Sequence, residues 1–150
     1  MNIRWTALLA SALAPMTLAA DLEISEAWVR ALPPTQSTTA AYLTVVNKGA
    51  AVVVINGASA ELAGRAELHN SVMVDGYMRM ESLPTVTLAP GETLALAPGG
   101  KHLMLLDLER MPSAGESLRV CLTLAEGEPA CIDAPVRRGD GADKHNHQHH

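Results

Sequence analysis

Phenylalanine is absent from this 150-residue chain, and aromatic residues together make up only 3% of it. A core built from aromatic rings is therefore excluded, so the core must consist mainly of Val, Leu, Ile and Ala. Beyond residue 20 the aromatic side chains are those of Trp28, Tyr42 and Tyr77. Roughly 110–130 ordered residues can still bury the core of one domain, which we expect over residues 21–136.

An excess of positive charge is also lacking. The chain has 11 Lys and Arg residues against 16 Asp and Glu residues, a formal net charge of −5. Nucleic acids and anionic lipid surfaces attract clusters of Lys and Arg, so neither is expected as a partner. The sequence shows no pairing of a nucleophile with a general base, which disfavours an enzyme.

Long apolar runs are missing except at the N-terminus. Arg4 is followed by an apolar run over residues 5–20 that ends in small residues, which is typical of a secretory signal peptide. A membrane anchor is the alternative, but the run is short, contains Pro15 and is followed at once by Asp21. Removal of residues 1–20 takes away one basic residue and leaves 10 basic against 16 acidic ones. With no second apolar span, we expect a soluble protein without a membrane anchor, in a Gram-negative periplasm.

Cysteine is scarce, with only Cys121 and Cys131 present. Because neither follows the signal peptide, a lipoprotein anchor would have no attachment point. In an exported chain two cysteines favour a disulfide. The residues between them predict a hairpin that turns near Glu126 and Gly127, which can set the two cysteines opposite one another. A metal site that uses the thiolates is the alternative.

Helical periodicity is missing too, because no stretch sustains a 3.6-residue apolar repeat. Short apolar or alternating runs, separated by Pro, Gly, Asn and Asp, are typical of strands. These runs cover residues 23–30, 38–46, 52–56, 66–74, 77–83, 85–89, 93–97, 102–108, 117–124 and 130–136. They predict an all-β fold, an antiparallel sandwich or Greek-key barrel. Residues 58–65 are the one stretch compatible with a single turn of helix.

Four residues carry the chemistry of this sequence: His69, Met80, His102 and Met104. Their spacing, His-x10-Met-x21-His-x-Met, supplies two imidazoles and two thioethers. Alternation along a strand places His102 and Met104 on one face. An Asp-Gly turn at residues 75–76 predicts a hairpin that folds the strand of His69 back against the strand of Met80.

This donor set points to Cu(I). A thioether is a soft, uncharged donor that selects Cu(I) over hard cations, and imidazole binds many late transition metals. A His and Met set without a thiolate is poor for structural zinc. The alternative is structural, since Met often fills irregular cores and a lone His is more often a hydrogen-bonded polar residue than a ligand.

Three segments, 27–49, 66–81 and 96–124, together resemble the PCu(A)C family of periplasmic copper chaperones. The resemblance extends over nearly all of residues 24–136, and the ligand spacing is its most specific part. It implies a cupredoxin-like version of the β fold, with the family's Cu(I) ligands falling on the same two histidines and two methionines. It also implies a client, either the apo CuA domain of cytochrome c oxidase or a thiol-bearing copper assembly factor.

Other functions use parts of the same pattern. Sequestration of copper for resistance needs the same ligands but no docking surface. A cupredoxin electron carrier needs a Cys ligand with His and Met in one loop, and neither residue follows Cys131 before the tail. The absence of that loop also weakens a thiolate copper site. We therefore favour a site held by the scaffold and exposed to a partner, which suits transfer of the metal.

Two further methionines, Met73 and Met78, lie near the candidate ligands. Met78 shares a strand face with Met80, but neither residue occupies a ligand position of the resembling family. We expect both to pack around the site rather than to bind the metal.

The last segment, residues 137–150, is polar and cannot contribute to a core, so it is expected to be a disordered tail. It carries four histidines, His145, His147, His149 and His150. Imidazoles in a flexible tail prefer Cu(II) over Ni(II) and Zn(II), which predicts a second, Cu(II)-binding site. A purification tag is the alternative, but tags are usually uninterrupted His runs, whereas Asn146 and Gln148 interrupt this one.

Overall fold

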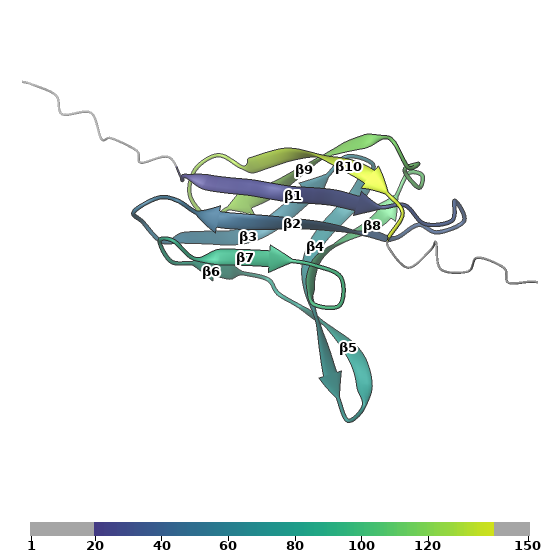
Figure 1. Cartoon of the computed structure of the whole chain (residues 1–150), viewed down its shortest axis with the longest axis horizontal. Helices are drawn as coiled ribbons and strands as arrows, with labels where there is room; N and C mark the ends of the chain where they lie inside the picture. Colours follow the sequence, from purple (N-terminus) through teal and green to yellow (C-terminus); the bar gives the residue numbers. More distant parts are fainter. Residues whose placement is uncertain (1–19, 140–150) are drawn as a thin grey trace, which may run out of the picture.

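The computed structural model describes residues 20–139, and all regular secondary structure in this range is β (Figure 1). The predicted signal peptide, except for its last residue, and the four tail histidines lie outside the described residues. The strands are β1 (Leu22–Arg30), β2 (Thr39–Asn47), β3 (Val53–Ala60), β4 (Ala63–Val74), β5 (Tyr77–Ser82), β6 (Val86–Leu88), β7 (Thr93–Leu96), β8 (Lys101–Leu108), β9 (Ser117–Leu124) and β10 (Ala130–Arg137). The described residues contain no helix with the length and apolar character needed to cross a bilayer.

Seven strands close into a barrel in the order β4-β8-β2-β1-β10-β9-β3, and the ring is completed where β3 pairs with β4. The remaining three are additions, since β5 pairs with β4, β6 with β3 and β7 with β2. The predicted all-β barrel is therefore confirmed. One pairing departs from the antiparallel expectation, because β1 and β10 run parallel. No hairpin joins the first and last strands, so their relative direction is not constrained by a turn.

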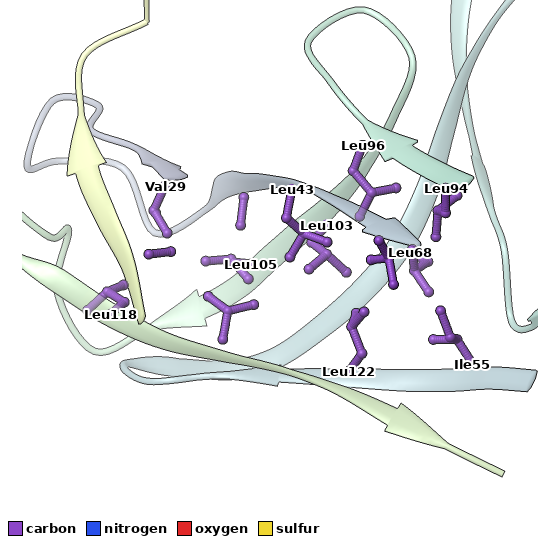
Figure 2. Close-up of a cluster of buried hydrophobic side chains, with 14 of the residues drawn as sticks. Val29, Leu43, Ile55, Leu68, Leu94, Leu96, Leu103, Leu105, Leu118 and Leu122 are labelled. Carbon is purple, nitrogen blue, oxygen red and sulfur yellow. The ribbon is translucent and has the colours of Figure 1, made fainter. Parts of the chain in front are cut away.

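Aliphatic side chains fill the barrel, as the lack of phenylalanine predicts. Leu43, Ile55, Leu103, Leu105 and Leu122 are at most 1% exposed and meet in the interior (Figure 2). The buried members of this cluster are all Val, Leu, Ile or Ala apart from one methionine. Alternation along each strand turns every second residue inward, so the intervening residues form the outer face, where the candidate ligands lie.

The helical turn considered for residues 58–65 is wrong, because β3 continues to Ala60 and β4 begins at Ala63. Leu62, between them, adopts a left-handed conformation with φ 66°. The backbone groups of this link are bonded outward: Glu61 N–H donates to the Arg119 carbonyl, and the Leu62 carbonyl accepts from Glu109 N–H. Neighbouring strands thus supply the hydrogen bonds that a helical turn would have made internally.

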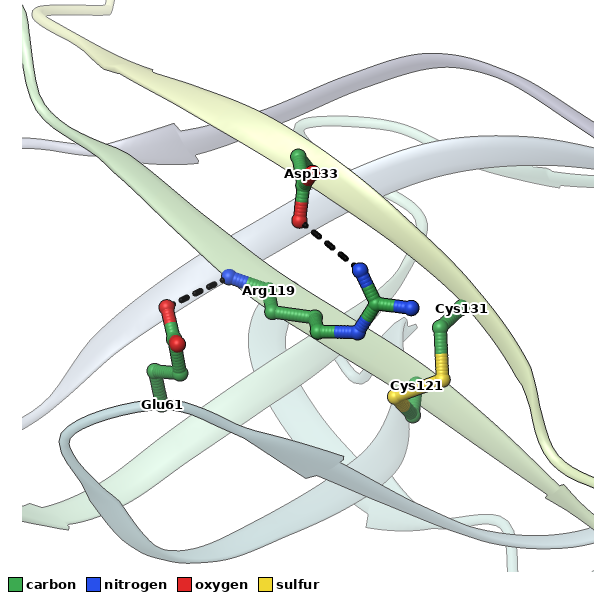
Figure 3. Close-up of a disulfide and its surroundings, with 5 residues drawn as sticks. All are labelled: Glu61, Arg119, Cys121, Cys131 and Asp133. Carbon is green, nitrogen blue, oxygen red and sulfur yellow. Dashed lines mark hydrogen bonds and ion pairs between the residues drawn. A yellow bond between two sulfur atoms is a disulfide. The ribbon is translucent and has the colours of Figure 1, made fainter.

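A disulfide joins Cys121 on β9 to Cys131 on β10, with the two sulfur atoms 2.01 Å apart (Figure 3). The two residues are direct cross-strand partners, and their Cα atoms are 4.0 Å apart. The predicted hairpin and bridge are both present. The described residues contain no free cysteine, so neither thiol is available as a metal ligand.

We expect replacement of both Cys121 and Cys131 by serine to lower the free energy of unfolding by roughly 2–3 kcal/mol, the chain-entropy value for a loop of about ten residues. Urea denaturation of the oxidised wild type and the variant measures this difference. The two cysteines lie on strands that carry none of the four candidate ligands, so the folded variant should bind as much Cu(I) as the wild type. A folded variant that no longer binds copper would instead identify the thiols as ligands.

Candidate metal centre

The two candidate histidines are cross-strand neighbours. His69 on β4 lies directly opposite His102 on β8, and their ring centroids are 6.0 Å apart. The next pair along, Leu68 and Leu103, is buried in the barrel core. Because side chains alternate between the two faces of a sheet, the imidazoles share the face that points away from the core.

His102 has only one of its two ring nitrogens engaged. Its Nδ1 lies 3.0 Å from the Gly100 carbonyl oxygen, which can only accept, so Nδ1 carries the hydrogen in the neutral ring. The same carbonyl accepts a hydrogen bond from Ser71 N–H of β4, at 3.2 Å. This shared acceptor ties the orientation of the His102 ring to the neighbouring strand. The other nitrogen, Nε2, is buried and has no hydrogen-bond partner among the described residues.

His69 shows the complementary arrangement. Its Nε2 lies 3.0 Å from a carboxylate oxygen of Glu67, so Nε2 donates and Nδ1 is left with a lone pair. Glu67 is itself held by Arg65, whose Nη1 lies 2.7 Å from the second carboxylate oxygen. Nδ1 of His69 is buried and has no partner among the described residues.

Each imidazole therefore offers one nitrogen lone pair while an outer partner fixes its tautomer. A buried polar atom without a partner costs about 1–3 kcal/mol, and two such atoms on neighbouring residues indicate a ligand that would satisfy both. Metal-binding histidines usually donate their second ring N–H to a carboxylate or a backbone carbonyl. Glu67 and the Gly100 carbonyl provide one of each, so the pair fits a transition-metal ion.

The two thioethers flank this histidine pair on the same face. Met104 lies opposite Glu67 on β4 and opposite Ala40 on β2. Met80 on β5 lies opposite Ser71 of β4 and is diagonal to His69, within the reach of a long side chain across a strand pair. The four candidates differ in exposure, because His102 is 5% exposed whereas Met80 is 57% exposed. The structure thus places an exposed thioether beside a buried imidazole, that of His102, and a half-buried one, that of His69.

Within residues 20–139, no three His, Cys, Asp or Glu side chains gather into a group that could hold a metal ion. Among the described residues, the soft side-chain donors that flank the histidine pair on its face are the thioethers of Met80 and Met104. This restriction favours a soft ion and disfavours zinc, calcium and magnesium.

Two aromatic residues cover the barrel beside the site. Tyr42 lies two residues beyond Ala40 on the same face of β2, and its ring stacks on Trp28 with centroids 4.6 Å apart. Arg137 lies over Trp28, its Cζ 4.2 Å from the ring centroid. Burial raises the pKa of Tyr42, and the nearby Arg30 opposes that shift. The phenol therefore stays neutral and adds no anionic oxygen to the surface beside the site.

Two features of the site differ from the sequence analysis. Met73 and Met78 do not pack around the site, because they are 65% and 57% exposed. They lie near the tip of the β4–β5 hairpin, where no other strand covers them. The role of Glu67 was not predicted, although its position two residues before His69, on the same strand face, was a usable signal.

Three comparisons place the chain among known proteins. A sequence profile of the family described as "Putative lipoprotein LpqE-like" matches residues 22–136. "Putative lipoprotein Lxx21020" of Leifsonia xyli subsp. xyli is 34% identical over 136 residues, which cover 90% of this chain and 81% of that protein. A copper-bound PCuAC domain from PmoF2 superposes with a TM-score of 0.65 at 22% identity, over 81% of this chain and 97% of that domain.

The solution structure of the Cu(I) form of DR1885 from Deinococcus radiodurans superposes with a TM-score of 0.57 at 29% identity, over 81% of this chain and 80% of that protein. These likenesses agree with the closed β-barrel and its cupredoxin-like arrangement. The chain therefore belongs to the LpqE-like family and has the fold of PCuAC domains.

Proposed function

We propose that this protein is an exported copper carrier that binds one Cu(I) ion through Nδ1 of His69, Nε2 of His102 and the thioethers of Met80 and Met104. The observation that carries the proposal is a pair of buried ring nitrogens on neighbouring strands that find no hydrogen-bond partner among residues 20–139. Copper is cargo here, so the task of the chain is to hold and release the ion, with no catalysis. The copper-bound state of two similar structures supports the choice of metal.

The donor set explains both binding and release. Two imidazoles and two thioethers are neutral, so the charge of the ion stays uncompensated and an incoming thiolate can displace a ligand. His69 and His102 are held in place by Glu67 and the Gly100 carbonyl, which lowers the cost of ordering them when the ion binds. Met80 is the exposed member. Exchange of ligands with a partner should therefore begin at Met80 and end at the two histidines, of which His102 is buried.

The proposed location is the periplasm, and the proposed client is an apo CuA domain of cytochrome c oxidase or a thiol-bearing copper assembly factor. The lipoprotein wording of the family and of the similar Leifsonia protein fits an exported chain. Both cysteines of this chain are held in the disulfide. The histidines of the tail, outside the described residues, would bind Cu(II) as a store separate from the Cu(I) of the core site.

A transfer assay tests this function. A form truncated after Gly139 keeps the four core ligands, so it should still bind Cu(I) while losing most Cu(II) binding. When loaded with Cu(I), it should metallate an apo CuA domain, or an apo thiol-bearing assembly factor, faster than free chelated copper does. Loaded protein that gives copper to neither acceptor, yet protects cells from excess copper, would support sequestration instead.

A further inference from the structure

The β4–β5 hairpin projects from the barrel (Figure 1), and its β4 strand continues past the pairing of His69 with His102 to the turn at Asp75 and Gly76. Its two-residue turn has positive φ at both Asp75 and Gly76, 50° and 80°, which is the backbone of a tight type I′ turn. Every residue of β5 is exposed. The described residues contain five large exposed hydrophobic side chains, and all but Val52 belong to this hairpin. Three of these are methionines, Met73, Met78 and Met80.

Met73 and Met78 are direct cross-strand partners next to the turn. Ser71 N–H donates to Gly100 on the β8 side, so Ser71 and Met80 form a pair without mutual backbone hydrogen bonds. Hydrogen-bonded and non-hydrogen-bonded pairs alternate along an antiparallel ladder. Met73 and Met78 lie two residues further along, so they also form a non-hydrogen-bonded pair. Side chains of such pairs are the closest in a sheet, with Cβ atoms about 4.5–5.5 Å apart. Two thioether sulfurs can therefore meet above this pair.

The three thioethers share one face of the hairpin with the candidate metal centre. Alternation places Met73, Met78 and Met80 on the face of His69. The charged residues of β5, Arg79 and Glu81, lie on the opposite face. Along four residues of β4 the methionine pair and the histidine pair are roughly 13 Å apart, and Met80 lies between them. The result is an uncharged row of thioethers from the hairpin tip to the histidine pair.

We propose that Met73 and Met78 form a second, outer Cu(I) site through which the ion reaches and leaves the inner centre. Both thioethers bind the ion, and Met80 completes the site when it does not serve the histidines. Passage between the two sites exchanges copper–sulfur bonds for copper–nitrogen bonds without moving electrons, so copper stays Cu(I). The direction of passage rests on the proposed function of the inner centre, whereas binding at the outer site does not.

The outer site can be tested on its own in the full chain carrying His69→Ala and His102→Ala. Adding Cu(I) to this variant should shift the methyl NMR signals of Met73 and Met78, and a competing chelator should reveal a weak site. Adding Met73→Leu and Met78→Leu should lower that affinity at least about tenfold, the lower end for loss of a metal-site partner. A matched control, Val72→Leu with Val74→Leu, alters the opposite face of the same hairpin and should leave the affinity unchanged. Methyl signals that do not respond to Cu(I), or equal affinities with and without the two methionines, would overturn the proposal.

The role in passage has a separate readout. With both histidines present, Met73→Leu with Met78→Leu should keep the affinity of the inner site and slow transfer of Cu(I) to an acceptor. An unchanged transfer rate would overturn the passage role. Loss of the inner affinity would overturn the separation into two sites. Failure of the inner centre itself would appear in the single variants His69→Ala and His102→Ala as unchanged Cu(I) affinity, so the two proposals fail in different experiments.

Discussion

His102→Ala is expected to weaken Cu(I) binding by more than the roughly 10–100-fold that loss of an outer partner costs a metal site. His102 is the most buried of the four candidate ligands, and its Nε2 has no other partner among the described residues. Alanine removes this donor and leaves His69 as the one imidazole of the proposed core site. Competition titration with a Cu(I) chelator measures the change.

The apo protein provides a second measurement of the same variant. The variant loses the buried ring and its Nδ1 hydrogen bond to the Gly100 carbonyl, but it also removes an Nε2 that no described residue satisfies, which offsets part of the lost stability of the apo protein. The increase in melting temperature on adding Cu(I) should disappear. Glu67→Ala is the matched control, since it removes only the partner of His69 and should stay within the 10–100-fold range.

Met80→Ala with Met104→Ala should also lose Cu(I) affinity. Unchanged affinity in that double variant would contradict the assignment of the thioethers.

Leu103→Ala is expected to lower the free energy of unfolding by about 2–5 kcal/mol, the range for truncating a buried leucine. Leu103 is fully buried and lies opposite Leu68 on β4 and Ala41 on β2. Its side chain points into the barrel, whereas its sequence neighbours His102 and Met104 lie on the outer face of β8. Because β4 and β2 flank β8 at this position, neighbouring side chains can fill only part of the cavity that the truncation of Leu103 would leave. Urea denaturation measures the loss.

Copper binding separates this variant from His102→Ala, although the two residues are adjacent in sequence. The folded fraction of Leu103→Ala should bind Cu(I) with wild-type stoichiometry because the two proposed ligands on β8, His102 and Met104, lie on the other face of that strand. Lys101→Ala is the control for stability, since this exposed position should change it by no more than about 0.5 kcal/mol. A folded Leu103→Ala protein without copper binding would show that the two faces of β8 are not independent.

The sequence predicted where the strands lie and which residues share a face, but it did not predict which strands pair with one another. Alternating runs located the strands closely, and the Asp-Gly pair identified the hairpin between β4 and β5 because both residues must adopt positive φ there. That His69 lies opposite His102 could not be predicted in the same way. The pairing of β4 with β8 joins segments distant in sequence, and alternation specifies which face a residue is on but not which strand lies beside it.

The hydrogen-bond partners of the two imidazoles could not be predicted from the sequence either. Whether Nδ1 or Nε2 is free depends on side-chain rotamers and on the carbonyl that the Gly99-Gly100 turn presents to His102. The ligand assignment itself stays a prediction, which the geometry supports by leaving one nitrogen of each ring unpartnered. The expected packing of Met73 and Met78 failed because hydrophobic character does not reveal that a hairpin extends past the body of the barrel.

The disulfide across β9 and β10 has a consequence for the redox behaviour of the protein. Both cysteines of the chain are bonded to each other, and the proposed copper donors are imidazoles and thioethers, none of which takes part in thiol–disulfide exchange. A change in the thiol–disulfide redox potential of the surroundings would therefore leave these ligands intact, whereas it would oxidise or reduce the ligands of a carrier that binds copper through thiolates. The proposed ligand set is instead sensitive to peroxide, which oxidises the exposed Met80 to methionine sulfoxide. Only a methionine sulfoxide reductase reverses this oxidation.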